Sequence, residues 1–258
     1  MSSAPAGWSG RRRPPRHPTS LAPDGPRSYP MLVNRQLLLP YAAPYLAYVA
    51  IASLLGELLA PEVNYILRIV VVVLLLAWAR GWYCALVGPR APAISIVVGL
   101  AAGLVGAVLW IGLLTPFVHQ GQTAPWSSAS FVLRLAAAGL LVPVFEELLM
   151  RGFIFRLALQ WDQARRGGDR QALQTALDER SVNAVRPGEW SWPAIVISTA
   201  VFTSGHVLQE WPAAIAFGLL MSWLWIVRKD LLSCIVAHAV TNVSLAGYVM
   251  VSGGWHLW

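Results

Sequence analysis

The chain has 258 residues, of which 57% are hydrophobic and only 12% are charged. Soluble globular domains carry roughly 25% charged residues, so this composition excludes an ordinary soluble domain. The formal net charge of +7 does not require a nucleic-acid partner, because basic residues at the ends of membrane helices can contact anionic lipid headgroups. We expect a multi-pass integral membrane protein that is surrounded by the lipid bilayer and binds no nucleic acid.

The first 35 residues differ from the rest of the chain in composition. They are rich in Pro, Ser and Arg and contain little that a core could bury, which is typical of disorder. The first long apolar run starts at Leu37, too late for the apolar stretch of a secretory signal. We therefore predict a disordered basic cytoplasmic tail over 1–35 and a membrane-embedded helical domain over 36–258.

Apolar runs of about 20 residues recur after the tail, and each is long enough to cross the ~30 Å hydrocarbon core as a helix. They predict an all-α fold, a polytopic bundle with about seven transmembrane spans. The polar loop over 161–189 separates two of the runs, and its 171–180 portion is expected to form a short surface helix. The expected spans cover 37–59, 64–80, 93–114, 130–160, 192–209, 212–227 and 231–251.

The basic residues outside the apolar runs predict the orientation of the bundle. Cytoplasmic loops carry an excess of Lys and Arg. In this chain, every Lys and Arg outside the apolar runs lies in the tail or in every second connection between spans. An N-inside, C-outside arrangement places every such connection in the cytoplasm. Those basic residues are Arg80, Arg90, Arg165, Arg166, Arg170, Arg180, Arg186, Arg228 and Lys229, in addition to the Arg-rich tail.

Two further sequence features are expected to serve packing only. Gly99 and Gly103 form a GxxxG spacing, which allows two membrane helices to approach closely. Cys84 and Cys234 lie at or inside apolar segments, and two cysteines make no metal-binding array.

Ionisable side chains inside apolar helices are the candidates for function. Each costs about 2.5 to 3.5 kcal/mol on insertion scales, so each needs a partner, a wet cavity or a chemical role. The polar groups of this kind are Arg68, Arg134, Glu146, Glu147, Arg151, His206, His238 and Asn242.

The fourth expected span contains an adjacent acidic pair, Glu146 and Glu147, followed by Arg151. Glu147 and Arg151 have the i,i+4 spacing of a favourable ion pair, with the acid on the N-terminal side. Adjacent helical residues point about 100° apart, so Glu146 is left to face elsewhere. Both acids could instead simply neutralise Arg151 and stabilise the bundle.

Two later spans contribute histidines. Phe202 and His206 lie one turn apart with small residues between them, and His238 and Asn242 share one helix face. Each pair alone is compatible with interhelical packing or hydrogen bonding. If they converged with Glu146, the carboxylate could act as general base on a water held by an imidazole, and N–H groups could stabilise an oxyanion.

At these residues the sequence resembles the CAAX protease and bacteriocin-processing family of intramembrane endopeptidases, which includes the type II CAAX prenyl proteases. The family pattern is EExxxR, FxxxH and HxxxN/D on successive core helices. The corresponding segments read EELLMR over 146–151, FTSGH over 202–206 and HAVTN over 238–242. The resemblance covers about 131–251.

The resemblance implies a role for each motif residue in peptide hydrolysis. Glu146 would activate water together with His206, while His238 and Asn242 would help to bind the oxyanion. The supporting residues would be Glu147, Arg151 and Phe202. The expected substrate is a membrane-associated or lipidated protein or peptide.

The motif-free N-terminal spans resemble those of a bacterial branch related to CAAX prenyl proteases and associated with exosortase sorting systems. This similarity implies the bacterial plasma (inner) membrane as location and an exosortase-type system as a possible partner. Cofactors are not expected. Zinc is the alternative, with Glu146, His206 and His238 as its ligands, although the chain lacks the HExxH spacing of zinc proteases.

Two other classes of function stay open at the sequence level. A non-catalytic membrane scaffold or immunity protein could retain the motifs as a structural cluster. A transporter could use buried carboxylates and histidines as a proton relay. Repeated halves are common in transporters, and the motifs of this chain do not repeat in its N-terminal half.

The catalytic hypothesis also requires the two histidines to lie at the same depth. Straight spans would leave His206 and His238 about 10 Å apart in depth, so convergence requires a broken or late-starting helix.

Overall fold

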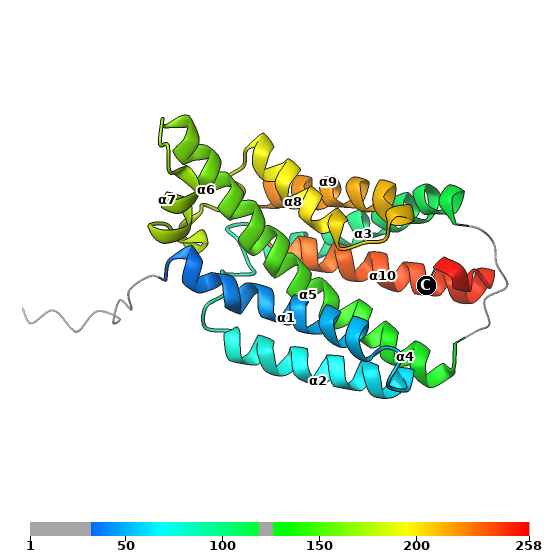
Figure 1. Cartoon of the computed structure of the whole chain (residues 1–258). Coiled ribbons are helices and arrows are strands. Elements are labelled where there is room, and N and C mark those ends of the chain that lie inside the picture. The colour runs from blue at the N-terminus through cyan, green and yellow to red at the C-terminus, as the bar shows by residue number, and fades with distance from the viewer. Residues whose placement is uncertain (1–31, 119–125, 258) are drawn as a thin grey trace, which may run out of the picture. The chain divides into compact units, whose positions relative to one another are not determined.

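The computed structural model describes residues 32–118 and 126–257 (Figure 1), and all regular structure within these ranges is helical. This confirms the all-α prediction. Residues 1–31 of the expected tail lie outside the described residues. The helices are α1 (Asn34–Leu55), α2 (Pro61–Ala79), α3 (Pro92–Leu114), α4 (Ser128–Ala136), α5 (Val142–Glu147), α6 (Phe155–Arg166), α7 (Ala172–Asp178), α8 (Trp192–Ser204), α9 (Trp211–Arg228) and α10 (Leu232–Ser252).

Six helices of the described ranges are long and apolar enough to span a membrane, in approximate agreement with the expected seven. The remaining expected span corresponds to α8, which has only 13 residues. At 1.5 Å per residue α8 covers about 20 Å, less than the ~30 Å hydrocarbon core. The chain continues through Gly205 and a short 3₁₀ turn, η5 (Leu208–Glu210), before α9 begins. Non-helical backbone at membrane depth is tolerated where it lines a cavity.

The fourth span is one continuous helical path, Ser128–Arg166, built from α4, α5 and α6. Two π-helical segments, η2 (Ala137–Leu141) and η3 (Leu148–Ile154), connect these helices. Such widened turns are frequent at functional sites. The acidic pair lies in α5, between the two widened segments.

The basic connections meet at one end of the bundle, where α1 begins (Figure 1). The backbone N–H of Asn34 donates to Arg180 O at 2.8 Å, which joins the start of α1 to the segment after α7. The N–H of Leu231 donates to Leu86 O at 3.0 Å, which joins the α9–α10 turn to the α2–α3 connection. This arrangement agrees with the orientation that the positive charges predict.

The outer surface of the helices is strongly apolar. Leu54, Val108 and Leu140 expose 73%, 72% and 76% of their surface, which suits side chains that contact lipid rather than water. The interior contains large aromatic side chains, and both cysteines are buried and free, in keeping with their expected packing role.

The GxxxG spacing holds α3 against α10. A Cβ atom on Gly103 would lie 2.5 Å from the Cβ atom of Val240, so only glycine permits this approach. The hydroxyl of Thr241 donates to Gly103 O at 2.9 Å across the same contact. This close packing fixes the helix that carries His238 and Asn242.

Candidate active site

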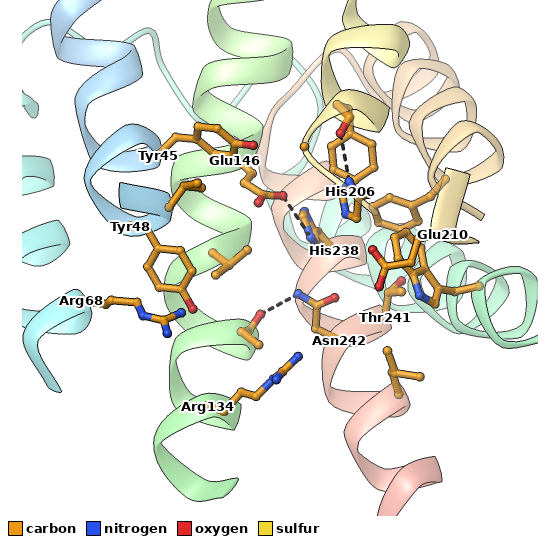
Figure 2. Close-up of a pocket in the computed structure, with 18 of the residues that line it drawn as sticks. Tyr45, Tyr48, Arg68, Arg134, Glu146, His206, Glu210, His238, Thr241 and Asn242 are labelled. Carbon is orange, nitrogen blue, oxygen red and sulfur yellow. Dashed lines mark hydrogen bonds and ion pairs between the residues drawn. The ribbon is translucent and has the colours of Figure 1, made fainter. Parts of the chain in front are cut away.

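The two glutamates of α5 point in different directions, as their adjacency on a helix predicts. The side chain of Glu147 is fully buried. The side chain of Glu146 is 15% exposed and lines a cavity of about 580 Å³. Figure 2 shows Glu146 facing this cavity opposite His206 and His238.

Glu147 forms a buried ion pair with Arg151, which confirms the pairing predicted from their spacing. Arg151 Nη1 donates to Glu147 Oε1 at 3.2 Å, and Arg151 Nη2 donates to Gly218 O in α9 at 2.9 Å. The guanidinium also lies 5.7 Å from the centre of the Phe202 ring. The pair therefore ties the fourth span to α8 and α9.

His238 lies between the two glutamates. Its Nδ1 atom is 3.1 Å from Glu147 Oε1, within hydrogen-bond distance, and its Nε2 atom is 3.7 Å from Glu146 Oε2. A carboxylate that receives an arginine N–H is an acceptor, so Nδ1 carries the proton that forms this bond. The hydrogen bond fixes the ring orientation and directs Nε2 toward Glu146.

His206 reaches the cavity because α8 ends early. The helix stops at Ser204, and His206 Nδ1 lies 3.0 Å from Phe202 O. A backbone carbonyl only accepts, so Nδ1 donates and Nε2 of the neutral ring is an acceptor. The ring packs between Trp110 and Phe202, at centroid distances of 5.3 and 4.7 Å. The short helix thus removes the depth difference that straight spans would have imposed.

Asn242 lines the same cavity one turn after His238. Its Nδ2 atom donates to Ala138 O at 2.7 Å, within the widened segment η2. A π-helical turn displaces the regular i→i+4 ladder, which makes a backbone carbonyl accessible to a side chain. One amide N–H is therefore used to join α10 to the fourth span, and only the other can serve a ligand.

The described residues contain no preformed zinc site. Within 32–118 and 126–257, no three His, Cys, Asp or Glu side chains come together as a metal-binding group. His206 and His238 each use Nδ1 for a hydrogen bond to the protein, which leaves Nε2 of each ring to face a water or a metal ion. The metal-free expectation and the alternative zinc set of Glu146, His206 and His238 both stay predictions.

The cavity also contains residues to which the sequence assigned no role. Arg68 and Arg134 stood out as costly intramembrane charges, but Arg68 lies in a span without a motif and Arg134 lies 12 positions before Glu146 in the fourth span, so the sequence did not place either side chain beside Glu146. The tyrosines of α1 gave no signal at all. The additional polar and aromatic lining residues include Tyr45, Tyr48, Arg68, Trp110, Arg134 and Glu210.

Comparison with known families agrees with this geometry. Residues 127–244 match the family model described as type II CAAX prenyl endopeptidase Rce1-like. This segment, somewhat less than half of the chain, is similar to the Rce1-like family. Neither the curated proteins nor the solved structures gave a significant match.

The Rce1-like segment contains every motif residue from Glu146 to Asn242. It confirms the predicted resemblance to type II CAAX prenyl proteases and supports a CAAX-type protease role in a membrane. The cavity extends beyond it, because α1 and α2 contribute Tyr45, Tyr48 and Arg68 to the lining. An Rce1-like core thus shares its cavity with helices outside the matched range.

Proposed function

We propose that this chain is an intramembrane endopeptidase that hydrolyses a peptide bond of a membrane-associated or lipidated protein with water activated by Glu146. The observation that carries the proposal is the position of the Glu146 carboxylate. It faces a cavity large enough for a peptide segment, beside His238 Nε2 and on a wall opposite His206. A bacterial inner-membrane location and an exosortase-type partner belong to the same proposal.

In this mechanism the attacking water lies between Glu146 and His206. Both present acceptors, the carboxylate and Nε2 of the neutral imidazole, so each receives one hydrogen of the water and the oxygen lone pair faces the substrate carbonyl. Glu146 takes a proton as the water oxygen bonds to the carbonyl carbon. The C–N bond then breaks, and Glu146 returns the proton to the leaving amine.

The oxyanion of the tetrahedral intermediate needs hydrogen-bond donors. The free N–H of Asn242 is one candidate, and Nε2–H of protonated His238 is the other. A positive His238 would lie between Glu146 and Glu147, with Arg151 on the far side of Glu147. The four charges alternate in sign and sum to zero, which permits a protonated ring in a buried position.

A structural role for the cluster is the competing function. The contacts of Glu147 with Arg151 and His238, and of Asn242 with Ala138, join three spans without any chemistry. A scaffold or immunity protein could depend on these contacts alone. It would not depend on Glu146. Among the described residues, the carboxylate of Glu146 makes an ion-pair contact of 3.7 Å with His238 and no closer hydrogen bond.

The test uses the purified full-length protein in lipid nanodiscs with a pool of N-palmitoylated peptides, and mass spectrometry detects new termini. We expect the native protein to cleave, Glu146→Gln to be inactive, and the exposed control Glu179→Gln to match the native protein. Cleavage should persist after exhaustive chelation. Equal cleavage by Glu146→Gln would refute the proposed base, and activity lost on chelation and restored by zinc would refute the metal-free mechanism.

A further inference from the structure

A tyrosine of α1 lies beside the two groups that hold the attacking water in the proposed mechanism. Tyr45 lines the cavity together with Glu146 and His206. Figure 2 shows its side chain extending from α1 toward Glu146, with the hydroxyl directed to the side of the cavity that contains His206. Because α1 precedes the Rce1-like segment in the chain, the match to that family assigns Tyr45 no role.

The Tyr45 hydroxyl touches the backbone of the turn that carries His206. A Cβ atom on Gly205 would lie 2.4 Å from the hydroxyl oxygen of Tyr45, so the hydroxyl fills the space that any other side chain would need. The backbone of Gly205 has a φ of −77°, which any L residue adopts readily. Glycine is therefore required at position 205 by the nearby hydroxyl and not by the backbone conformation.

The Tyr45 hydroxyl makes no hydrogen bond within residues 32–118 and 126–257. Its ring packs edge-on against Phe145 at a centroid distance of 6.2 Å. The phenol is near enough to Glu146 for an electrostatic interaction, although no hydrogen bond joins the two side chains. A hydroxyl without a protein partner in a polar cavity bonds to a water or to a ligand atom.

We propose that Tyr45 is a further catalytic residue, whose hydroxyl donates a hydrogen bond to the water that Glu146 activates. The inference rests on the proposed function. That water gives one hydrogen to Glu146 and one to His206, and one of its two lone pairs faces the substrate carbonyl. The other lone pair accepts the hydrogen bond from Tyr45. These contacts fix the water in the geometry of attack.

Tyr45 keeps its own proton throughout the reaction. Glu146 takes the proton of the water as the new C–O bond forms, and it returns that proton to the leaving amine as the C–N bond breaks. The oxygen of the former water stays a hydrogen-bond acceptor in the tetrahedral intermediate, so the contact with Tyr45 persists. The catalytic group of an Rce1-like core is thus completed by a helix outside the matched range.

Tyr45→Phe removes the hydroxyl and keeps the ring that packs against Phe145. The assay uses purified full-length protein in lipid nanodiscs and the N-palmitoylated peptides that the native protein cleaves. We expect kcat to fall at least about tenfold, because the water loses one of its fixed contacts, while KM and Tm stay close to the native values. The control Tyr248→Phe, on the exposed side of α10, should keep the native kcat.

A second set of variants tests the position of the hydroxyl without any substrate. Gly205→Ala should lower the Tm, because the new Cβ atom meets the Tyr45 hydroxyl. The same substitution in the Tyr45→Phe background should lower the Tm much less, since the obstructing oxygen is gone. Equal decreases in the two backgrounds would show that the hydroxyl does not lie against Gly205 and would overturn the inference.

The kinetic outcomes separate this role from the proposed function. Native kcat in Tyr45→Phe would overturn the role of Tyr45 and leave Glu146-dependent proteolysis standing. A raised KM at unchanged kcat would also overturn it and assign the hydroxyl to substrate binding. Absence of any Glu146-dependent cleavage by the native protein would overturn both the proposed function and the role of Tyr45.

Discussion

His238 Nδ1 lies 3.1 Å from Glu147 Oε1, so the second glutamate of the acidic pair holds the histidine that faces the first. Glu147 also accepts from Arg151, and neither side chain is exposed. The adjacent glutamates thus have different environments and different expected roles. Glu147 is a positioning residue, and Glu146 is the group that reaches the cavity.

This difference predicts that replacement of each glutamate by glutamine has a very different effect on stability. Glu147→Gln removes the carboxylate that balances buried Arg151, and we expect a loss of about 3 to 5 kcal/mol in stability. Glu146→Gln should leave stability nearly unchanged, because no buried cation depends on that carboxylate alone. Thermal unfolding in one detergent measures both variants. Equal destabilisation would show that Glu146 is also a structural residue.

The close approach of α3 and α10 should be sensitive to one methyl group. Gly103→Ala places a Cβ atom 2.5 Å from the Val240 Cβ atom, and we expect a cost of about 1 to 3 kcal/mol. Gly112→Ala in the same helix meets nothing within 4 Å and should be neutral or slightly stabilising. Thermal unfolding of the two variants, measured in parallel, tests this difference. Equal stability of Gly103→Ala and Gly112→Ala would contradict the close packing of α3 against α10.

The sequence predicted the spans well because apolar length and basic connections are strong local signals. It also predicted the Glu147–Arg151 pair, which depends only on helical spacing. It could not predict that α8 ends at Ser204, because residues 192–209 read as one apolar run. The widened turns beside the acidic pair gave no signal either. Arg68 and Arg134 were recognised as unusual, but only tertiary packing places them in the cavity with Glu146.

Asn242 should contribute separately to stability and to catalysis. Asn242→Ala removes the hydrogen bond to Ala138 O, with an expected loss of about 1 kcal/mol in stability. If the free N–H also stabilises the oxyanion, kcat should fall by about 100-fold or more at a temperature where the variant is fully folded. Unfolding curves and kcat at that temperature provide the two values. A fall of less than tenfold would assign Asn242 to packing alone.

The two histidines should differ in chemical rescue. His206 is partly exposed to the cavity, so His206→Ala leaves a space that free imidazole can enter, and we expect partial recovery of its lost activity when imidazole is added. His238 is only 4% exposed and hydrogen-bonded to Glu147, so His238→Ala should not recover. Cleavage rates over an imidazole titration test this difference. Recovery of both variants would show that His238 is not held as the structure places it.

The central claim is that Glu146 carries out peptide hydrolysis in the membrane. Its most direct test is a comparison of newly formed peptide termini in membranes from cells that carry the native protein, Glu146→Gln or Glu179→Gln at matched expression. We predict a set of termini that is present with the native protein and with Glu179→Gln and absent with Glu146→Gln. Identical termini in all three, with the substrate pool shown to be present, would contradict the protease account and favour the scaffold.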